Sequence, residues 1–141
     1  MEIFGLLLFI FGLLASVMVH EFGHYIFARK YGMRVSEFFV GFGKRIWSTQ
    51  RGETEFGIKA IPAGGYCRIE GMTPTDVMPE GEADRAFIKA SVPKKLAVLG
   101  AGSAGHFIVG YLLLAILLVG VGTTGALPTI KEIVPCVPDA T

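Results

Sequence analysis

Cysteine is scarce in this sequence, and basic residues are missing ahead of its first apolar run. The only two cysteines, Cys67 and Cys136, lie far apart and form no Cys-x-x-Cys pair, which excludes a disulfide framework. A secretory signal peptide would carry positive charge before its apolar core, whereas Glu2 is the only charged residue there. We therefore expect the first apolar run to belong to the mature protein.

Charged residues are also few, at 18% of the 141-residue chain, and they are unevenly placed. Of the 13 Lys and Arg residues, twelve lie between Arg29 and Lys95, and only Lys131 lies outside. The formal net charge of +1 argues neither for nor against a nucleic-acid partner, and we expect none. The 52% hydrophobic content favours a membrane protein, in contact with the lipid bilayer, over a cytosolic one.

Two apolar runs are long enough to cross a bilayer as helices. Ile3 to Ala28 has 26 residues, and Leu96 to Gly122 has 27, with His106 as its only ionisable residue. The positive-inside rule places the basic segment between them in the cytoplasm and the N-terminus outside. The predicted fold class is a membrane α-helical protein of the cell membrane, with spans at 1–28 and 96–122, a cytosolic or interfacial segment at 29–95 and the start of an extracytoplasmic segment at 123–141.

The first apolar run contains His20-Glu21-Phe22-Gly23-His24, a His-Glu-x-x-His motif. On a helix His20 and His24 lie one turn apart on the same face, where two imidazoles can bind one Zn²⁺ with Glu21 as general base. The alternative is a pair of histidines satisfied by backbone carbonyls or neighbouring helices. That alternative explains one histidine more easily than two with a glutamate between them, and ionisable residues inside a span are by default functional.

Catalytic zinc is bound by three protein ligands and keeps one open position, so a third ligand is needed. His106 is the one internal candidate, because its depth along the second span is compatible with that of His20 and His24. The alternative is that His106 holds an ordinary polar position against the interior of a helix bundle.

Residues 53–70 have the pattern of a β-hairpin. Apolar residues alternate from Phe56 to Ala60, Pro62-Ala63-Gly64-Gly65 offers a turn, and Tyr66 to Ile69 would return. Such a hairpin must be covered, and it can enter the membrane where it lines a cavity. Its exposed edge would hold an unwound stretch of substrate as an added strand, with expected contacts at Phe56, Ile58, Gly64, Gly65 and Tyr66.

The segments that flank this hairpin are less distinctive. Residues 31–50 mix aromatic residues with Gly, Lys and Arg, which suits a membrane interface or a small core under a loop. Residues 71–84 form a polar loop broken by Pro and Gly. Residues 85–95 suit a short amphipathic helix interrupted at Pro93, or a plain connector.

The second apolar run contains Gly100-Ala101-Gly102-Ser103-Ala104-Gly105, a literal G-x-G-x-x-G sequence. A dinucleotide site would need a surrounding βαβ unit and an acidic residue about twenty positions further on, and neither is present. We therefore expect no nucleotide ligand. Small residues four apart, at Ala97, Ala101 and Gly105, instead indicate a surface for close helix packing.

Taken together, these segments resemble the site-2 protease family of intramembrane zinc metalloproteases, and most closely its bacterial branch that cleaves membrane-bound anti-sigma factors. The resemblance lies in HEFGH at 20–24, FFVGFG at 38–43, GETEFGIKAIPAGGYCRIEGM at 52–72 and AFIKASVPKKLAVLGAG at 86–102. It implies a first helix with two zinc ligands and the catalytic glutamate, then a membrane-re-entrant β-hairpin. It also implies a PDZ domain after the second span, whose opening the tail at 128–138 resembles.

The sequence departs from the family pattern in three places. The family's third zinc ligand, an aspartate in an Asp-Gly motif on a later span, has no counterpart here. The residues 102–106 (GSAGH) stand where the family usually has G-P-x-x-N, and Lys44 stands where it often has proline. We therefore expect the N-terminal part of an endopeptidase that cleaves single-span, anti-sigma-factor-like membrane proteins. The alternative is a non-catalytic membrane module, or pseudoprotease, that binds partners without cutting them.

Overall fold

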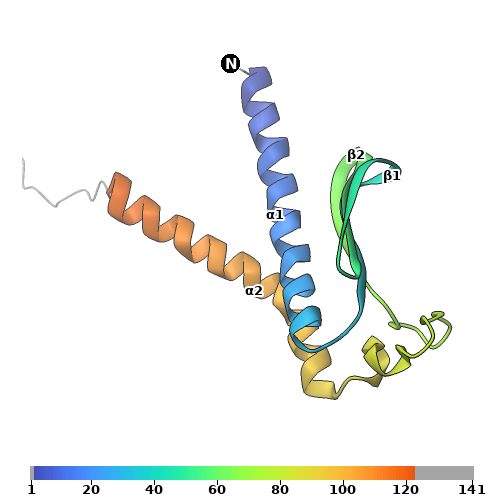
Figure 1. Cartoon of the computed structure of the whole chain (residues 1–141). Helices are drawn as coiled ribbons and strands as arrows, with labels where there is room; N and C mark the ends of the chain where they lie inside the picture. The colour runs from blue at the N-terminus through green and yellow to red at the C-terminus, as the bar shows by residue number, and fades with distance from the viewer. Residues whose placement is uncertain (1, 123–141) are drawn as a thin grey trace, which may run out of the picture.

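The computed structural model describes residues 2–122 of the chain. Helix α1 lies between two neighbours: α2 crosses it near its C-terminal half and then diverges, and a twisted β-hairpin runs along its other side (Figure 1). The elements in chain order are α1 (Glu2–Lys30), β1 (Val35–Arg51), β2 (Thr54–Ile69), the 3₁₀ turns η1 (Ala83–Arg85) and η2 (Phe87–Lys89), α2 (Val92–Ile116) and a π-helical turn, η3 (Leu117–Val121).

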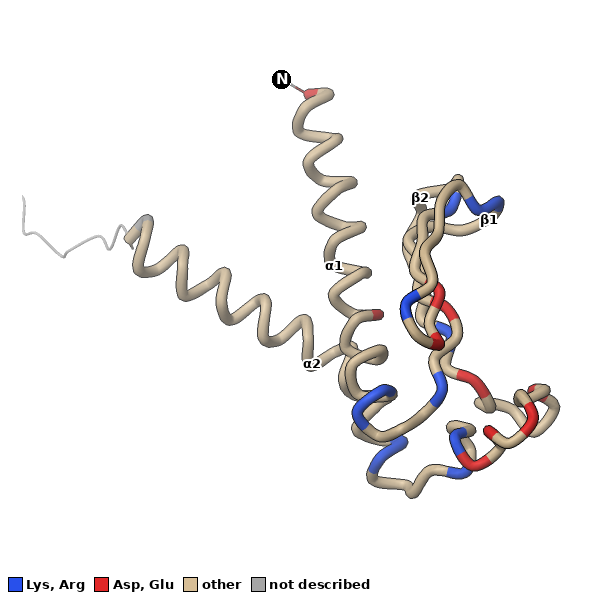
Figure 2. Tube along the Cα trace, viewed as in Figure 1, with Lys and Arg blue, Asp and Glu red and all other residues tan. Residues whose placement is uncertain are grey.

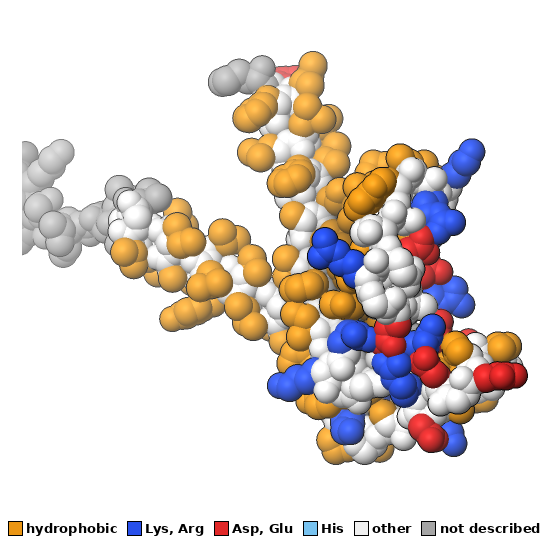
Figure 3. All heavy atoms as spheres, in the orientation of Figure 1, with side chains coloured by type: hydrophobic (Ala, Val, Ile, Leu, Met, Phe, Trp, Pro, Cys, Tyr) orange, Lys and Arg blue, Asp and Glu red, His pale blue; other side chains and the backbone are white. Residues whose placement is uncertain are grey.

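The two predicted apolar helices are present, with somewhat different bounds. By length and composition, Glu2–Lys30 and Val92–Gly120 are able to cross a membrane. Their large side chains point outward rather than into a core: Ile3 is 77% exposed and Phe107 is 79% exposed. Apolar side chains accordingly cover the visible face of both helices, whereas charged residues gather on the hairpin and the segment after it (Figures 2 and 3).

The C-terminal end of α1 is closed by a Schellman motif. Gly32 adopts a left-handed conformation with φ 78°. Its N–H donates to the carbonyl of Arg29 at 3.1 Å, and the N–H of Met33 donates to the carbonyl of Ala28 at 2.9 Å. Arg29 and Lys30 in the last turn complement the helix dipole. This cap turns the chain sharply, so that β1 starts beside the helix end.

The prediction of a short helix interrupted at Pro93 is wrong. Residues 83–89 form two 3₁₀ turns, and α2 starts at Val92, four residues before the predicted start of the second span. Pro93 lies in the first turn of α2, where its missing N–H has no intrahelical partner to lose and its fixed φ suits the helix. Proline here begins a helix and does not break one.

A two-stranded antiparallel hairpin is confirmed, but the predicted bounds of 53–70 are wrong. The chain reverses at Gly52-Glu53, between β1 and β2, and again within β2 between Ile58 and Gly65, because residues 55–58 run in the same direction as residues 37–40 and residues 65–68 run in the opposite direction. The segment at 31–50, for which the sequence suggested an interface or a small core, supplies β1. The glycines at 64 and 65, at the end of this reversal, also allow close approach: a Cβ on Gly64 would lie 3.2 Å from the ring of Phe42, and one on Gly65 would overlap the Met18 sulfur of α1.

The middle of β1 has partners on both sides. Residues 37–40 pair with residues 65–68 and also with residues 55–58 of β2. This double pairing requires both strands to bend, and Gly41 and Gly43, each with φ 83°, supply the bend in β1. The two apolar halves that the sequence suggested as partners in β2 therefore flank β1 and do not pair with each other.

The core of the described residues lies where α1 ends, the hairpin begins and α2 starts. It consists of six buried residues, Ala28, Met33, Val35, Ile69, Phe87 and Val98, with Tyr25, Phe27, Tyr31, Cys67 and Ala90 packed against them. This core therefore connects α1, the hairpin, η2 and α2 beside the C-terminal half of α1. The predicted strand at 129–134 and the PDZ-like start lie outside the described residues.

Candidate active site

His20 and His24 lie together on the face of α1 that contacts α2. Their ring centroids are 4.7 Å apart, with the planes at 79°. Both residues are half-buried. The i, i+4 spacing on a regular helix thus gives the side-by-side arrangement that the motif predicts.

The two imidazoles converge on the backbone of α2 at Gly102. A Cβ placed on Gly102 would lie 2.6 Å from Nε2 of His24 and 2.7 Å from Nε2 of His20. The two Nε2 atoms therefore face the same small space, which exists only because residue 102 has no side chain. Gly23 has the matching role on α1, because its Cβ would overlap the backbone of Ala101.

A backbone carbonyl of α2 orients His24. Nδ1 of His24 lies 2.7 Å from the carbonyl oxygen of the fully buried Val98. A carbonyl can only accept, so Nδ1 carries the proton and Nε2 is left with its lone pair toward the shared space. Histidine metal ligands in proteins are commonly held in this way by their second nitrogen.

Glu21 points to the opposite neighbour of α1. Its Oε2 accepts a hydrogen bond of 3.0 Å from the backbone N–H of Cys67 in β2. Burial, and then the negative charge of Glu21, raises the pKa of the Cys67 thiol to about 12, so this thiol is neutral at physiological pH. The helix therefore presents its histidines to α2 and its carboxylate to the hairpin.

His106 lies close to the histidine pair but not within it. It comes one turn after Gly102 on the same face of α2, and its ring centroid is 5.2 Å from that of His20, with the planes at 47°. It is exposed and borders an apolar groove of about 360 Å³ between α1 and α2. Among the described residues, no three His, Cys, Asp or Glu side chains are arranged to hold a metal ion.

The two side-chain nitrogens that converge on Gly102 have the chemistry of zinc ligands. Two neutral imidazole nitrogens, one fixed by a carbonyl, suit two of the three protein ligands of a catalytic zinc. The residues present therefore fit zinc as an incomplete ligand set. The resemblance described above implies that the remaining ligand would come from a later span.

The five expected substrate contacts fall into two groups. Phe56 pairs through its backbone with Phe38 and Thr49, and Ile58 pairs with Val40 and Trp47. Both flanks of these two residues are occupied, so the expectation that they hold an added strand is wrong. The error arose because the partners on both flanks belong to β1, which the sequence did not identify as a strand.

The other three, Gly64, Gly65 and Tyr66, lie on the part of β2 that approaches α1. Gly65 packs against Met18, two residues before His20. Tyr66 stacks on Phe39, and its hydroxyl contacts Lys59 at 2.5 Å and Glu37. Burial and the Glu37 carboxylate raise the pKa of Tyr66, which keeps this phenol neutral. The stretch at 64–67 is thus the part of the hairpin nearest to Glu21.

Three groups that build the site were missed by sequence reasoning. The Val98 carbonyl and the Cys67 N–H are backbone atoms, and no residue type signals their use. Gly102 was noticed only as part of a nucleotide-like glycine pattern. Its position four residues before His106, in a helix that must cross a His-Glu-x-x-His helix, was the signal that could have found it.

Comparison with known proteins identifies a family. The model of peptidase family M50 matches residues 8–137. Zinc metalloprotease Rip1 of Mycobacterium tuberculosis (strain H37Rv) is 51% identical over 102 residues, 72% of this chain and 25% of that protein. Rip1 of Mycolicibacterium smegmatis is 43% identical over 132 residues (91% and 32%), and the regulator of sigma-E protease RseP of Salmonella typhimurium is 37% identical over 134 residues (94% and 29%).

The chain spans a quarter to a third of the length of these relatives. The match confirms the resemblance to site-2 proteases that the motifs indicated. Because it extends over nearly all of the sequence, the chain belongs to peptidase family M50.

Proposed function

We propose that this chain carries the general base and two zinc ligands of an intramembrane zinc endopeptidase. One observation carries the proposal: Nε2 of His20 and Nε2 of His24 converge on Gly102, while Glu21 extends from the same turn of α1. A purely structural pair of histidines would be expected to bond neighbouring groups with both rings. Here the described contacts leave both Nε2 atoms facing one space. The names of the relatives, zinc metalloproteases, support the same chemistry.

Glu21 is the residue to which we assign proton transfer. Bound zinc would act as a Lewis acid that activates water and polarises the peptide carbonyl. The Glu21 carboxylate takes a proton from the attacking water while the water oxygen forms a bond to the carbonyl carbon of the substrate. It then returns that proton to the amide nitrogen as the C–N bond breaks, so that an amine and a carboxylic acid leave. The Cys67 N–H holds the carboxylate in place beforehand.

Residues 64–67 of β2 are the segment we assign to substrate. A substrate helix hides its carbonyls in its own hydrogen bonds and must unwind before it is cut. An unwound stretch that pairs with Gly64, Gly65 and Tyr66 would lie beside Glu21, because the next residue already bonds that carboxylate. Strand pairing reads backbone atoms, so it suits substrates of varied sequence.

The substrate class we propose is a single-span membrane protein of the anti-sigma-factor type. It is supported by the relative named regulator of sigma-E protease and by two helices apolar enough to cross a membrane. We place the protein in the cell membrane with its N-terminus outside and residues 29–95 in the cytoplasm. The concentration of twelve of the 13 Lys and Arg residues in that segment supports this orientation.

His106 is the residue of this chain that we propose to test as a third ligand. It comes one turn after Gly102 on α2, and its ring centroid lies 5.2 Å from that of His20. Zinc content measured on the purified chain and on His106→Ala decides the matter. A loss of bound zinc in the variant supports ligation, and unchanged zinc assigns His106 to the wall of the groove.

The proposed activity is tested with a single-span model substrate, reconstituted in vesicles with the longest form of the protein. We expect cleavage that Glu21→Gln abolishes and that a zinc chelator stops reversibly. Glu55→Gln, on the hairpin and away from α1, is the matched control and should retain cleavage. Cleavage that persists in Glu21→Gln and in the presence of chelator would refute the proposal.

A further inference from the structure

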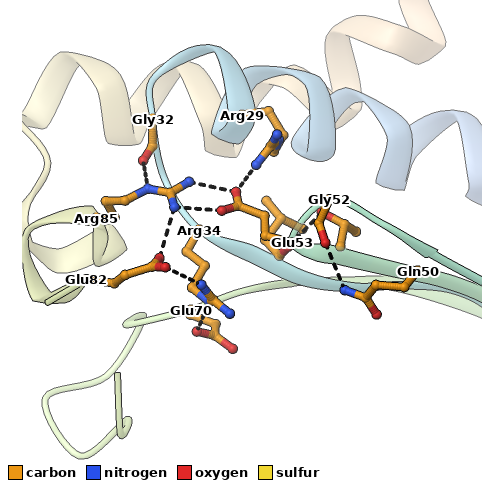
Figure 4. A network of polar contacts seen from close by, with 11 residues as sticks. Arg29, Gly32, Arg34, Gln50, Gly52, Glu53, Glu70, Glu82 and Arg85 are labelled. Carbon is orange, nitrogen blue, oxygen red and sulfur yellow. Dashed lines mark hydrogen bonds and ion pairs between the residues drawn. The ribbon is translucent and has the colours of Figure 1, made fainter. Parts of the chain in front are cut away.

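Six charged residues form an alternating chain beside the C-terminal end of α1. In order of contact they are Arg29, Glu53, Arg85, Glu82, Arg34 and Glu70 (Figure 4). They come from α1, the β1–β2 turn, the η1 region, the start of β1 and the end of β2. Three positive and three negative charges alternate, so each interior member has a neighbour of opposite sign on both sides.

The Glu53–Arg85 pair is the centre of this chain and its best-formed contact. Nη1 and Nη2 of Arg85 each lie 2.6 Å from a different oxygen of Glu53, which is the bidentate fork typical of strong Arg–carboxylate pairs. Nε of Arg85 donates to the carbonyl of Gly32 at 2.9 Å, and Arg29 contacts the same carboxylate. The turn of the hairpin is thereby tied to the cap of α1 from three directions.

The rest of the chain anchors η1. Glu82 receives Nη1 of Arg85 at 2.9 Å and Nη1 of Arg34 at 2.7 Å. Nε of Arg34 lies 2.9 Å from Glu70 as an ion pair whose atoms are not aligned for a hydrogen bond. Backbone bonds from Phe87 to Glu70 and from Arg34 to Arg85 join the same segments. These contacts fix the position of Arg85 opposite Glu53.

Most of the other contacts between the hairpin and α1 are apolar and less directional than an ion pair. The rings of Phe38 and Phe56 pack on Tyr25 with centroids 5.6 and 5.4 Å away, and such apolar contacts tolerate sliding. The other directional contact is the hydrogen bond from Cys67 N–H to Glu21. Because Cys67 pairs with Phe38 of β1, a rotation of the whole hairpin at its Gly52-Glu53 end would move Cys67 away from Glu21.

We propose that the Glu53–Arg85 pair positions the hairpin on α1 and thereby holds the Cys67 N–H on the Glu21 carboxylate. Both are positioning residues, since neither touches Glu21 or the histidines. Their importance for cleavage rests on the function proposed above, whereas the docking of the hairpin is independent of it. The pair thus links a charged contact at the helix end to the group that would transfer the proton.

The Cys67 thiol reports this docking directly. It is half-buried between the hairpin and the two helices, beside His24 and Val98, so movement of the hairpin away from them should make it more accessible to reagents. In a Cys136→Ser background of the full chain in detergent, the rate of N-ethylmaleimide labelling is measured. Glu53→Gln and Arg85→Gln should each raise the rate by about tenfold or more, and Arg85→Lys, which keeps the charge without the fork, should be intermediate.

A matched variant and a second thiol separate positioning from unfolding. Arg45→Gln removes another Arg–Glu pair, with Glu55, that joins the strands without contacting α1, and should leave the rate unchanged. Ala101→Cys, in a background without the other two cysteines, probes the α1–α2 crossing, where Ala101 is 4% exposed. This thiol should stay protected in Glu53→Gln.

Two results would overturn the proposal. One is unchanged labelling of Cys67 in both Glu53→Gln and Arg85→Gln. The other is equal opening at Cys67 and at Ala101→Cys, which would make the pair a support of the whole fold. In the cleavage assay the two variants should lower turnover without loss of bound zinc. A chain that labels as expected but never cleaves refutes the proposed function and leaves the positioning role intact.

Discussion

Helix α1 contacts α2 and the hairpin in physically different ways. Toward α2 it presents Gly23, which packs against the backbone at Ala101 and Gly102, and no ion pair joins the two helices among the described residues. Toward the hairpin it presents the aromatic ring of Tyr25 and, at its end, Arg29 in the charged chain. The first contact depends on missing side chains, and the second depends on long polar ones.

This difference separates the two halves of the site. The α2 contact brings His20 and His24 to one point and fixes His24 through the Val98 carbonyl, so it governs metal binding. The hairpin contact places the Cys67 N–H on Glu21, so it governs the base. Close backbone packing tolerates no added atom, whereas an ion-pair network responds to charge, salt and pH in gradual steps. Four predictions follow from this contrast.

The largest effect is expected for Gly102→Ala. Its Cβ would lie within 2.7 Å of both Nε2 atoms, so one imidazole must move, and zinc affinity should fall about 10–100-fold. Gly100→Ala is the matched control, since a Cβ there meets nothing within 4 Å. Both changes favour helix by about 1 kcal/mol, so helix stability cannot explain a difference between them. Competition with a chromogenic chelator measures the affinities, and equal zinc binding in both variants would contradict the role of Gly102.

A smaller effect is expected inside the hairpin at Thr54, which is 1% exposed. Its hydroxyl donates to the carbonyl of Val35 at 2.7 Å. Thr54→Val keeps the shape and leaves that carbonyl without its donor, which should lower the free energy of unfolding by about 1–2 kcal/mol. Denaturant unfolding followed by Trp47, the only tryptophan, measures it, with the less buried Thr49→Val as control. No loss of stability would show that this buried hydrogen bond does not stabilise the hairpin.

The sequence predicted the relative placement of the motif residues on α1 well and the partners of those residues poorly. His20, Glu21 and His24 form one motif on one helix, so a local spacing fixes their relative positions. The hairpin bounds failed because alternation in residues 56–69 marks strand character and does not name the partner strand. The partner strand is β1, and its Phe38–Phe42 stretch consists of aromatic residues, a valine and a glycine without regular polar and apolar alternation.

The contacts of the site with α2 could not be predicted from local sequence patterns for a related reason. A glycine in an apolar helix can serve a turn, a nucleotide or a helix crossing, and only the neighbour decides which. Gly102 and Gly100 belong to the same motif, yet one faces two imidazoles and the other faces nothing within 4 Å. Backbone donors and acceptors, such as Cys67 N–H, follow from tertiary packing alone.

The third prediction concerns salt. Raising sodium chloride from 0.05 to 0.5 M screens the Arg–Glu chain, parts of which are exposed, with Arg29 at 40% and Arg85 at 35%. Labelling of Cys67 should rise a few-fold, while zinc affinity stays unchanged because the α2 contact carries no charges. In Glu53→Gln the salt dependence should largely disappear. A zinc affinity that falls in parallel with hairpin docking would mean that the two contacts are not separable.

The smallest effect is expected from pH, through Glu82. The hydrogen bond from Arg34, and then the charges of Arg34 and Arg85, hold the pKa of Glu82 below its ordinary value of 4.5. Its pKa is therefore lower folded than unfolded, so its contribution is present above about pH 4.5 and is lost as pH falls through the folded pKa. Between pH 5 and pH 3 the thermal midpoint, followed by Trp47, should fall less in Glu82→Gln than in the parent.

Glu80→Gln, on the same segment but outside the charged chain, is the control and should keep the parent's slope. If Glu82→Gln also keeps that slope, the carboxylate is not linked to folding through Arg34 and Arg85. In that case the charged chain would end at Arg85, which would hold the hairpin turn on the cap of α1 without support from Glu82. The pH slope of Glu82→Gln thus measures how far along the chain the docking of the hairpin is supported.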